Sequence, residues 1–175
     1  MPGIQGVEAI LSETGKLERL YDWLGATESY RKALGLVSEQ DFSRIGDVYE
    51  RIGYAFHRAA MQAETVQEFR ARCAKAIEHY EKSKEFYGRL REPEKAPRIL
   101  RCDAMVAYVN YWLSSEVAEK KRQIDACWRL VKEALRTFEK VGDACEYGKT
   151  YNQLSMSIAI AFSLEWDPQV RENTI

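Results

Sequence analysis

The sequence predicts an all-α fold of about seven helices, arranged as antiparallel helical hairpins that stack into an α-solenoid. Two observations carry this prediction. Apolar residues recur every three or four positions along most of the chain, which is the spacing of an amphipathic helix, and no run alternates with period two for long enough to form a sheet. One helical face also recurs with a period of 50 residues, as in proteins built from stacked helical units.

The recurring face has a small residue, a large residue four positions on, and a second small residue three or four positions further. Its three copies are Ala26 with Tyr30 and Ala33, Ala76 with Tyr80 and Ser83, and a drifted set of Ala126, Leu130 and Ala134. Small residues let neighbouring helices approach closely, and the large residue fills the gap between them. We therefore expect three related helices in successive hairpins.

The first half of the chain is expected to form four helices. A short helix over residues 4–12 ends near Gly15, and a second helix runs over 16–37. A third helix then reaches residue 62, and a fourth covers 65–90. The connections are short, so sequential helices should pack antiparallel.

The second half is expected to form three more helices. The proline-containing stretch 92–97 interrupts the pattern, because proline is tolerated before a helix or in its first turn. A fifth helix follows over 99–113. The sixth ends at residue 141, before a turn at Gly142–Asp143, and the seventh runs over 147–162.

Capping residues mark three of these helix starts. The pairs are Ser38 with Asp41, Thr65 with Glu68, and Ser114 and Ser115, either of which could be the cap. The second pair has the form of a capping box, in which a threonine accepts from a first-turn amide and a glutamate reaches back. The other two pairs offer a simple N-cap.

We expect one domain over residues 1–175, made of four units. The units cover residues 1–37, 38–90, 91–142 and 143–175. Asp167 followed by Pro168 has the form of another helix start. We therefore expect the array to be cut within an eighth helix, at the C-terminal end; the alternative is that this last helix is a vestigial cap.

Composition and charge argue against several classes of protein. Lys and Arg number 26 against 27 Asp and Glu, for a formal net charge of -1, whereas a nucleic-acid-binding domain usually carries a basic excess on one face. The N-terminal residues lack the pattern of a signal peptide, and no apolar run is long enough to span a membrane. The four cysteines stand singly, which favours free thiols in a reducing compartment. We therefore expect a cytoplasmic protein with no nucleic-acid and no membrane partner.

Signatures of catalysis or of a cofactor are missing from the sequence. The two histidines, His57 and His79, have no Glu or Asp three residues before them, as a carboxylate-histidine metal motif in a helical bundle requires. The glycines form no phosphate-binding loop. We therefore expect no metal, no cofactor and no enzymatic activity.

One segment resembles a known family. Residues Leu24–Leu34 are similar to the second helix of a tetratricopeptide repeat (TPR), which has a small residue, an aromatic residue four on and an alanine three further on, and Ala76, Tyr80 and Ser83 match in the next copy. The period of the family is about 34 residues, so the longer period here implies atypically long helices. The resemblance implies a TPR-like right-handed superhelix with a concave groove that binds other proteins.

Six residues are candidates for binding a partner protein. They are Arg51, Arg101, Tyr151, Asn110, Tyr111 and Asn152. The first three stand 50 residues apart, so a solenoid would align them along one face, and the resemblance implies that this face lies in or beside the groove. Two arginines there would offer forked donors to acidic groups. The other interpretations are a solvated outer stripe for this ladder, core packing between long helices for the tyrosines, and, for the asparagines, core amides with satisfied hydrogen bonds.

These observations predict a non-enzymatic protein–protein interaction module, acting as a scaffold or regulatory domain, that binds a peptide or helix of its partner in a concave groove. One alternative is a structural homo-oligomerisation domain, whose open C-terminal end around Tyr147–Trp166 packs on a second copy. Another is a small-ligand sensor with a pocket in the bundle interior, which nothing in the sequence favours.

Overall fold

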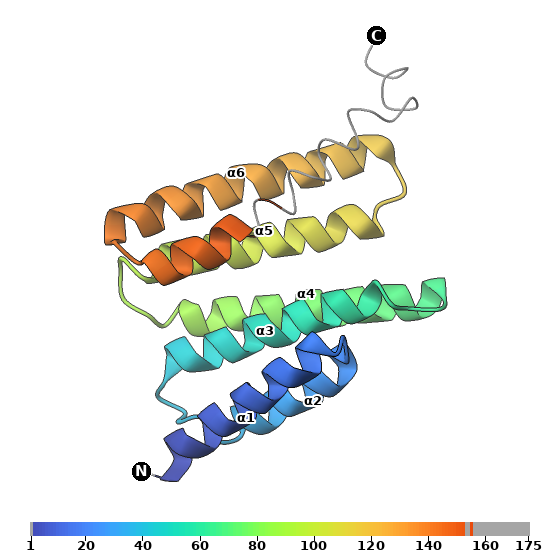
Figure 1. Cartoon of the computed structure of the whole chain (residues 1–175). Coiled ribbons are helices and arrows are strands. Elements are labelled where there is room, and N and C mark those ends of the chain that lie inside the picture. The colour runs from blue at the N-terminus through green and yellow to red at the C-terminus, as the bar shows by residue number, and fades with distance from the viewer. Residues whose placement is uncertain (1, 153–154, 156–175) are drawn as a thin grey trace. The chain divides into compact units, whose positions relative to one another are not determined.

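The computed structural model describes residues 2–152 and residue 155, and these residues are helical apart from short connections (Figure 1). The labelled helices are α1 (Pro2–Arg19), α2 (Trp23–Leu34), α3 (Phe42–Ala60), α4 (Val66–Tyr87), α5 (Lys95–Leu113) and α6 (Val117–Val141). Residues 144–152 form a further helical segment. The described part of the chain contains no strand, so the predicted all-α fold of about seven helices is confirmed.

The chain divides into two compact units. The N-terminal unit covers residues 1–90 and the C-terminal unit covers 91–175. In the N-terminal unit, α2 packs against both α1 and α3, and α3 packs against α4; in the C-terminal unit, α5 packs against α6. Each of the pairs α3–α4 and α5–α6 is a hairpin of two long antiparallel helices (Figure 1).

The boundary between the first two helices differs from the prediction. α1 continues through Gly15 to Arg19, and the break falls at residues 20–22. There Tyr21 adopts a left-handed conformation with φ of 60°, and the Asp22 side chain accepts a hydrogen bond of 2.9 Å from the backbone N–H of Gly25. A glycine costs a helix interior only about 0.5–1 kcal/mol, whereas the capping aspartate satisfies an amide that the new helix leaves unpaired. The cap therefore sets the boundary.

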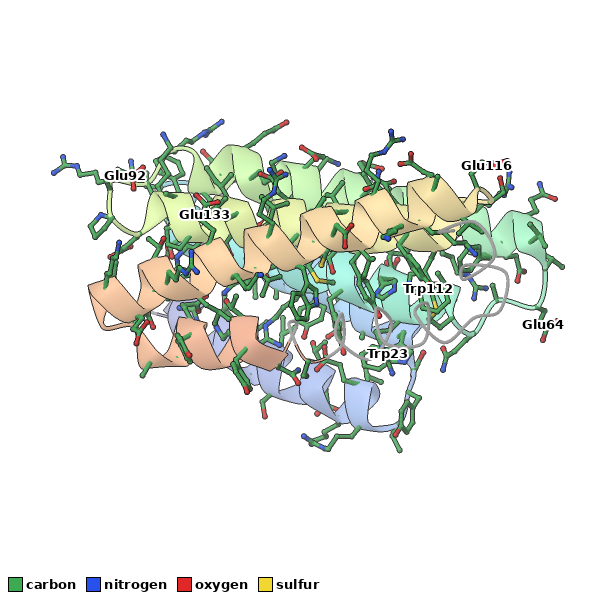
Figure 2. The ribbon with its side chains drawn as sticks, turned by 90° about the horizontal axis from the view of Figure 1, so that it is seen from above. Trp23, Glu64, Glu92, Trp112, Glu116 and Glu133 are labelled. Carbon is green, nitrogen blue, oxygen red and sulfur yellow. The ribbon has the colours of Figure 1, made fainter. Side chains whose placement is uncertain are left out.

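The starts of α3 and α4 both depend on a side-chain cap. Asp41, and not Ser38, caps α3, since its carboxylate accepts from the N–H of Arg44 at 3.0 Å. Thr65 caps α4 as predicted, accepting from the N–H of Glu68 at 3.1 Å. The Glu68 carboxylate reaches back to the N–H of Glu64, in the α3–α4 turn (Figure 2), at 3.2 Å, one residue before the position that a capping box uses.

The predicted serine cap of α6 is wrong. Glu116 precedes the first residue of α6 (Figure 2), and no side chain caps the helix. The Ser114 hydroxyl instead donates to the carbonyl of Asn110 at 2.7 Å, which ties it to the end of α5. The predicted turn is present, because Gly142 ends α6 in a left-handed conformation with φ of 77°.

The recurring small–large–small face is buried in all three helices that carry it, but its third copy is displaced by one residue. The buried sets are Ala26, Tyr30 and Ala33 in α2, Ala76, Tyr80 and Ser83 in α4, and Cys127, Val131 and Ala134 in α6. Ala126 and Leu130, which the 50-residue period predicts, are only half-buried. The face that α6 turns to its neighbour thus follows α4 after 51 residues, and the fixed period missed it.

Two glycines of α3 bring it close to α4. A methyl group added at Gly46 would lie 2.5 Å from the Tyr87 ring, and one added at Gly53 would lie 3.1 Å from the carbonyl oxygen of Ala76. At this contact, the buried Ser83 hydroxyl donates to the Gly46 carbonyl at 2.8 Å. A Cβ at Gly46 would force the Tyr87 ring to move, and one at Gly53 would make an unusually close contact, so the two glycines allow α3 to approach α4 closely.

None of the helices among the described residues combines the length and the apolar character that a membrane crossing requires. The predicted helix start at Asp167, the end of the predicted seventh helix and most of the predicted open end over 147–166 lie outside the described residues.

Candidate functional site

The N-terminal unit contains a pocket of about 240 Å³ between α2, α3 and α4. Its polar and aromatic lining consists of Arg31 from α2, Tyr49 from α3, and Lys75, Glu78, His79 and Lys82 from α4. Leu34 and Ile52 complete the wall. Three cations against one carboxylate give this pocket a local positive charge, although the whole chain is close to neutral.

Two of these cations lie over the same buried aromatic ring. The Arg31 guanidinium carbon lies 5.5 Å from the centroid of the Phe56 ring, and the Lys75 ammonium lies 5.3 Å from the same centroid. Cation–π contacts at exposed sites are worth about 0.5–1 kcal/mol each. The two cations come from different helices, so folding brings like charges together. An anion placed beside them would be attracted by both.

The pocket cations differ in their acidic neighbours. Arg31 pairs with Glu28 at 2.5 Å, and Lys82 pairs with Glu78 at 2.6 Å. Lys75 has no carboxylate within ion-pair distance among the described residues. Exposed pairs of this kind contribute no more than about 1 kcal/mol. A bound carboxylate can therefore replace or join them at low cost.

His79 forms a neutral part of the lining. Its Nδ1 lies 2.8 Å from the carbonyl oxygen of Lys75, and a carbonyl can only accept, so Nδ1 carries the proton and Nε2 can accept a hydrogen bond. Burial is the main cause that lowers the pKa of His79, and the charges of Lys82 and Arg31 lower it further. The imidazole is therefore neutral at pH 7 and adds no charge to the pocket.

An aromatic row extends from the pocket along the α3–α4 hairpin. We give this name to Phe56, His79, Tyr49, Phe86 and Phe42. The ring centroids of neighbours are 5.3 Å apart for Phe56 and His79, 6.1 Å for His79 and Tyr49, and 5.5 Å for the stacked rings of Tyr49 and Phe86. Arg89 closes the row, since its guanidinium carbon lies 4.9 Å from the Phe86 centroid and 5.3 Å from that of Phe42. The row therefore has cations at both ends.

Arg51, the first residue of the predicted ladder, is exposed on α3. Its guanidinium donates to the Tyr30 hydroxyl at 3.3 Å, and this hydroxyl donates to the Glu18 carboxylate at 2.7 Å. Burial of the phenol is the main reason why the pKa of Tyr30 is raised well above its usual value, with the Glu18 carboxylate as the next cause. Arg51 thus joins α1, α2 and α3 while it stays within reach of solvent.

Arg101, the second ladder residue, lies inside the C-terminal unit. Only 1% of its surface is exposed, and its guanidinium pairs with the buried carboxylate of Glu146 and lies 5.6 Å from the Phe138 ring centroid. Although burial raises the pKa of Glu146, Arg101 and Lys149 lower it to about 2. The donors of Arg101 therefore serve packing within this unit.

The other predicted partner-binding residues of the C-terminal unit fall into two environments. Tyr111 is buried and Asn110 is half-buried on α5. Tyr151, which is 56% exposed and stacks on Tyr147 at 6.3 Å, and Asn152 are exposed. The unit therefore does not bring Tyr151 and Arg101 to a common exposed face. The ladder as a whole spans both units and stays a prediction.

Sequence reasoning missed the pocket residues because it compared positions 50 residues apart, whereas the pocket joins three helices that follow each other. A signal within each helix could have found them. Lys75, Lys82 and Arg89 stand seven residues apart. So do the three aromatic residues of α3 that belong to the aromatic row. A spacing of seven residues returns a side chain to nearly the same helical face.

A comparison of the chain with protein-family models found no match, and a comparison with curated proteins found no significant match. Within the described part of the chain, no group of three or more His, Cys, Asp or Glu residues is placed to hold a metal ion.

Proposed function

We propose that this chain is a non-enzymatic protein–protein interaction module that binds an acidic segment of a partner protein in the pocket between α2, α3 and α4. The observation that carries the proposal is the convergence of Arg31 and Lys75 on the buried Phe56 ring. Interaction sites often combine aromatic residues and arginine at their centre with a polar rim.

The pocket chemistry suits a carboxylate. Arg31 offers a planar fork of donors, and Lys75 offers a point charge from the opposite wall. The apolar side chains of Leu34 and Ile52 in the lining lower the local dielectric, which strengthens both contacts. Nε2 of His79 accepts a hydrogen bond from an N–H of the partner. Glu28 and Glu78 partly neutralise Arg31 and Lys82, so the acidic group of the partner exchanges with these two carboxylates.

The helical hairpins fit a TPR-like solenoid with long helices, and we include this architecture in the proposal. Support comes from the pairing of α3 with α4 and of α5 with α6, and from the face that recurs in α2, α4 and α6. Such a protein acts as a scaffold or regulatory domain in the cytoplasm. Arg51, exposed on α3, is available for a second contact with the partner.

A variant-controlled pull-down from native cell extract, with mass spectrometry, tests this function. The pocket variant is Arg31→Gln with Lys75→Gln, and the matched control is Arg19→Gln with Lys32→Gln, two exposed cations that do not line the pocket. Circular dichroism establishes that both stay folded. We expect a protein that is retained by the wild type and the control, is lost from the pocket variant, and is released by an added acidic peptide.

Two results would contradict the proposal. A partner that the pocket variant and the control retain equally would place binding on another face. Recovery of this chain alone, with a mass that rises with concentration, would favour the homo-oligomerisation domain.

A further inference from the structure

We infer that the acidic segment of the partner is an α-helix that lies along α4 and presents acidic side chains seven residues apart. This inference rests on the proposed function and narrows it, because an acidic segment could also bind in an extended form. The spacing of cations and rings along the α3–α4 hairpin supports the helical form.

The cations form a row on one face of α4. Lys75 and Lys82 lie on α4 seven residues apart, and Arg89 stands seven residues further, two residues past the end of the helix, where its N–H bonds to the Phe86 carbonyl at 3.0 Å. Two helical turns advance by about 10.5 Å, so the row covers about 21 Å. Lys75 and Arg89 are exposed and have no carboxylate within ion-pair distance among the described residues.

An apolar strip runs beside the cations. The aromatic residues of α3 in this strip are Phe42, Tyr49 and Phe56, again spaced by seven, and ring contacts join them to His79 and Phe86 of α4. Phe42, Tyr49 and Phe86 are half-buried, so part of each ring faces solvent. The hairpin therefore offers an apolar strip with a parallel line of positive charges.

The spacing discriminates between a helix and an extended chain. A helix returns a side chain to the same face after seven residues, and it advances by about 10.5 Å in doing so. An extended chain advances by about 3.3 Å per residue and presents every second residue to one face, so its side chains recur at about 6.6 or 13.2 Å. Only the helix matches three successive cations. Its apolar residues would then cover the aromatic row, as in other helix-in-groove complexes.

A second copy of this chain does not supply such a helix among the described residues. The helix that comes nearest is α4, where Glu78 and Glu85 stand seven apart, but Glu92, the next position, lies in the connection that precedes α5. Charge complementarity therefore points to a helix of a different protein.

Three synthetic peptides of one length and one acidic content test the inference by fluorescence anisotropy. The first is a helix-forming peptide with three glutamates spaced by seven and leucines on the adjoining face. The second has its glutamates spaced by five. The third keeps the original spacing but contains prolines that prevent a helix.

Two protein variants with equal charge change accompany the wild type. The variant that removes the cations beside the apolar strip, called the strip variant, is Lys75→Gln, Lys82→Gln, Arg89→Gln. The control is Arg19→Gln, Lys32→Gln, Arg70→Gln, whose side chains are exposed and belong neither to the row of cations nor to the aromatic row. We expect the first peptide to bind the wild type and the control alike. The strip variant should bind it about tenfold more weakly, because three partly exposed ion pairs are lost. The wild type should bind the second peptide about tenfold more weakly than the first.

Equal binding of the first two peptides, or equal binding by both variants, would overturn the inference. Tight, strip-dependent binding of the proline peptide would overturn the helix while the proposed function stands. If no peptide binds saturably, both fail. Self-association of the wild type that the strip variant loses would assign the strip to a second copy, which also overturns the inference.

Discussion

The guanidinium of Arg101 pairs with the carboxylate of Glu146 inside the C-terminal unit, where 1% and 5% of the two residues are exposed. The pair ties α5 to the helical segment 144–152, which follows the Gly142 turn. Glu146 also accepts from Lys149 at 2.6 Å, and its backbone N–H donates to the Asp143 carboxylate at 3.0 Å. Removing any one partner of a buried charge is costly, because the remaining partners cannot fully replace it.

Replacing one member of this pair should destabilise the C-terminal unit strongly. We expect Arg101→Met to lower the free energy of unfolding by about 3–5 kcal/mol, because a buried carboxylate loses its main partner. The double variant Arg101→Met with Glu146→Met should recover part of this loss. Chemical denaturation followed by circular dichroism measures both. The exposed Arg136→Met serves as the control, and a loss for Arg101→Met no greater than for this control would contradict the expectation.

Glu146 should also make stability depend on acidic pH. Its folded-state pKa of about 2 lies below the ordinary value of 4.5. The unfolded chain therefore binds the proton first, and the stabilisation, complete above pH 4.5, is lost as the pH falls toward 2. Denaturation midpoints recorded across this range should fall more steeply for the wild type than for Glu146→Gln. Parallel curves would show that the carboxylate does not carry this dependence.

His57 should add a second dependence at milder pH. Burial, with the nearby charge of Arg58, lowers the pKa of His57 to about 4 from 6.5. Between these two pH values the unfolded state binds a proton at His57 and the folded state does not. The free energy of unfolding is therefore highest above pH 6.5 and decreases as the pH falls, by about 3 kcal/mol at most. Measured unfolding free energies should show this slope, and His57→Gln should flatten it. His79 shifts in the same direction, so His79→Gln provides the comparison.

The close approach of α3 and α4 predicts opposite effects for two glycine substitutions. Gly46→Ala should destabilise the N-terminal unit by about 1–3 kcal/mol, because its methyl group would lie 2.5 Å from the buried Tyr87 ring. Gly15→Ala should leave stability unchanged or raise it by up to about 1 kcal/mol, because the nearest atom, at the end of the Arg19 side chain, is 3.7 Å away. Thermal unfolding compares the two. Destabilisation by Gly15→Ala would contradict the continuous α1.

A second pair of substitutions distinguishes the two candidate N-caps of α3. Asp41→Ala removes the acceptor of the Arg44 amide and should cost about 1 kcal/mol. Ser38→Ala lies outside the helix start and should change stability by less than about 0.5 kcal/mol. Equal losses, measured by urea denaturation, would show that both side chains support the helix.

Helix identity could be predicted from the sequence, but helix boundaries could not always be. Apolar spacing is a property of whole segments, so it survives single exceptions, and α3 and α4 lie where the pattern placed them. Boundaries depend on single hydrogen bonds. Gly15 looked like a helix end, but the competition was decided by the Asp22 side chain seven residues later.

The residues of the candidate site were harder to predict than the fold. Arg101 matches Arg51 in the 50-residue repeat, yet it is buried, and its acidic partner Glu146 lies 45 residues further along the chain. A repeat predicts equivalent positions but not which of them a neighbouring helix covers. Two cations of the pocket, from α2 and α4, lie over the Phe56 ring of α3, and such a contact exists only once the three helices are packed.

The interlocking of α3 with α4 also determines how the pocket can adapt. The Tyr87 ring against Gly46, and the Ser83 hydroxyl on the Gly46 carbonyl, prevent these two helices from sliding past each other without loss of a buried contact. The part of the pocket wall that α3 and α4 form is therefore held together, and its cations and aromatic residues keep their spacing of seven residues. The other wall is α2, which joins this hairpin through residues 35–41. A change in the width of the pocket would come from α2. In the proposed binding mode this short helix would therefore select partners by their size, while the hairpin would set the register in which they bind.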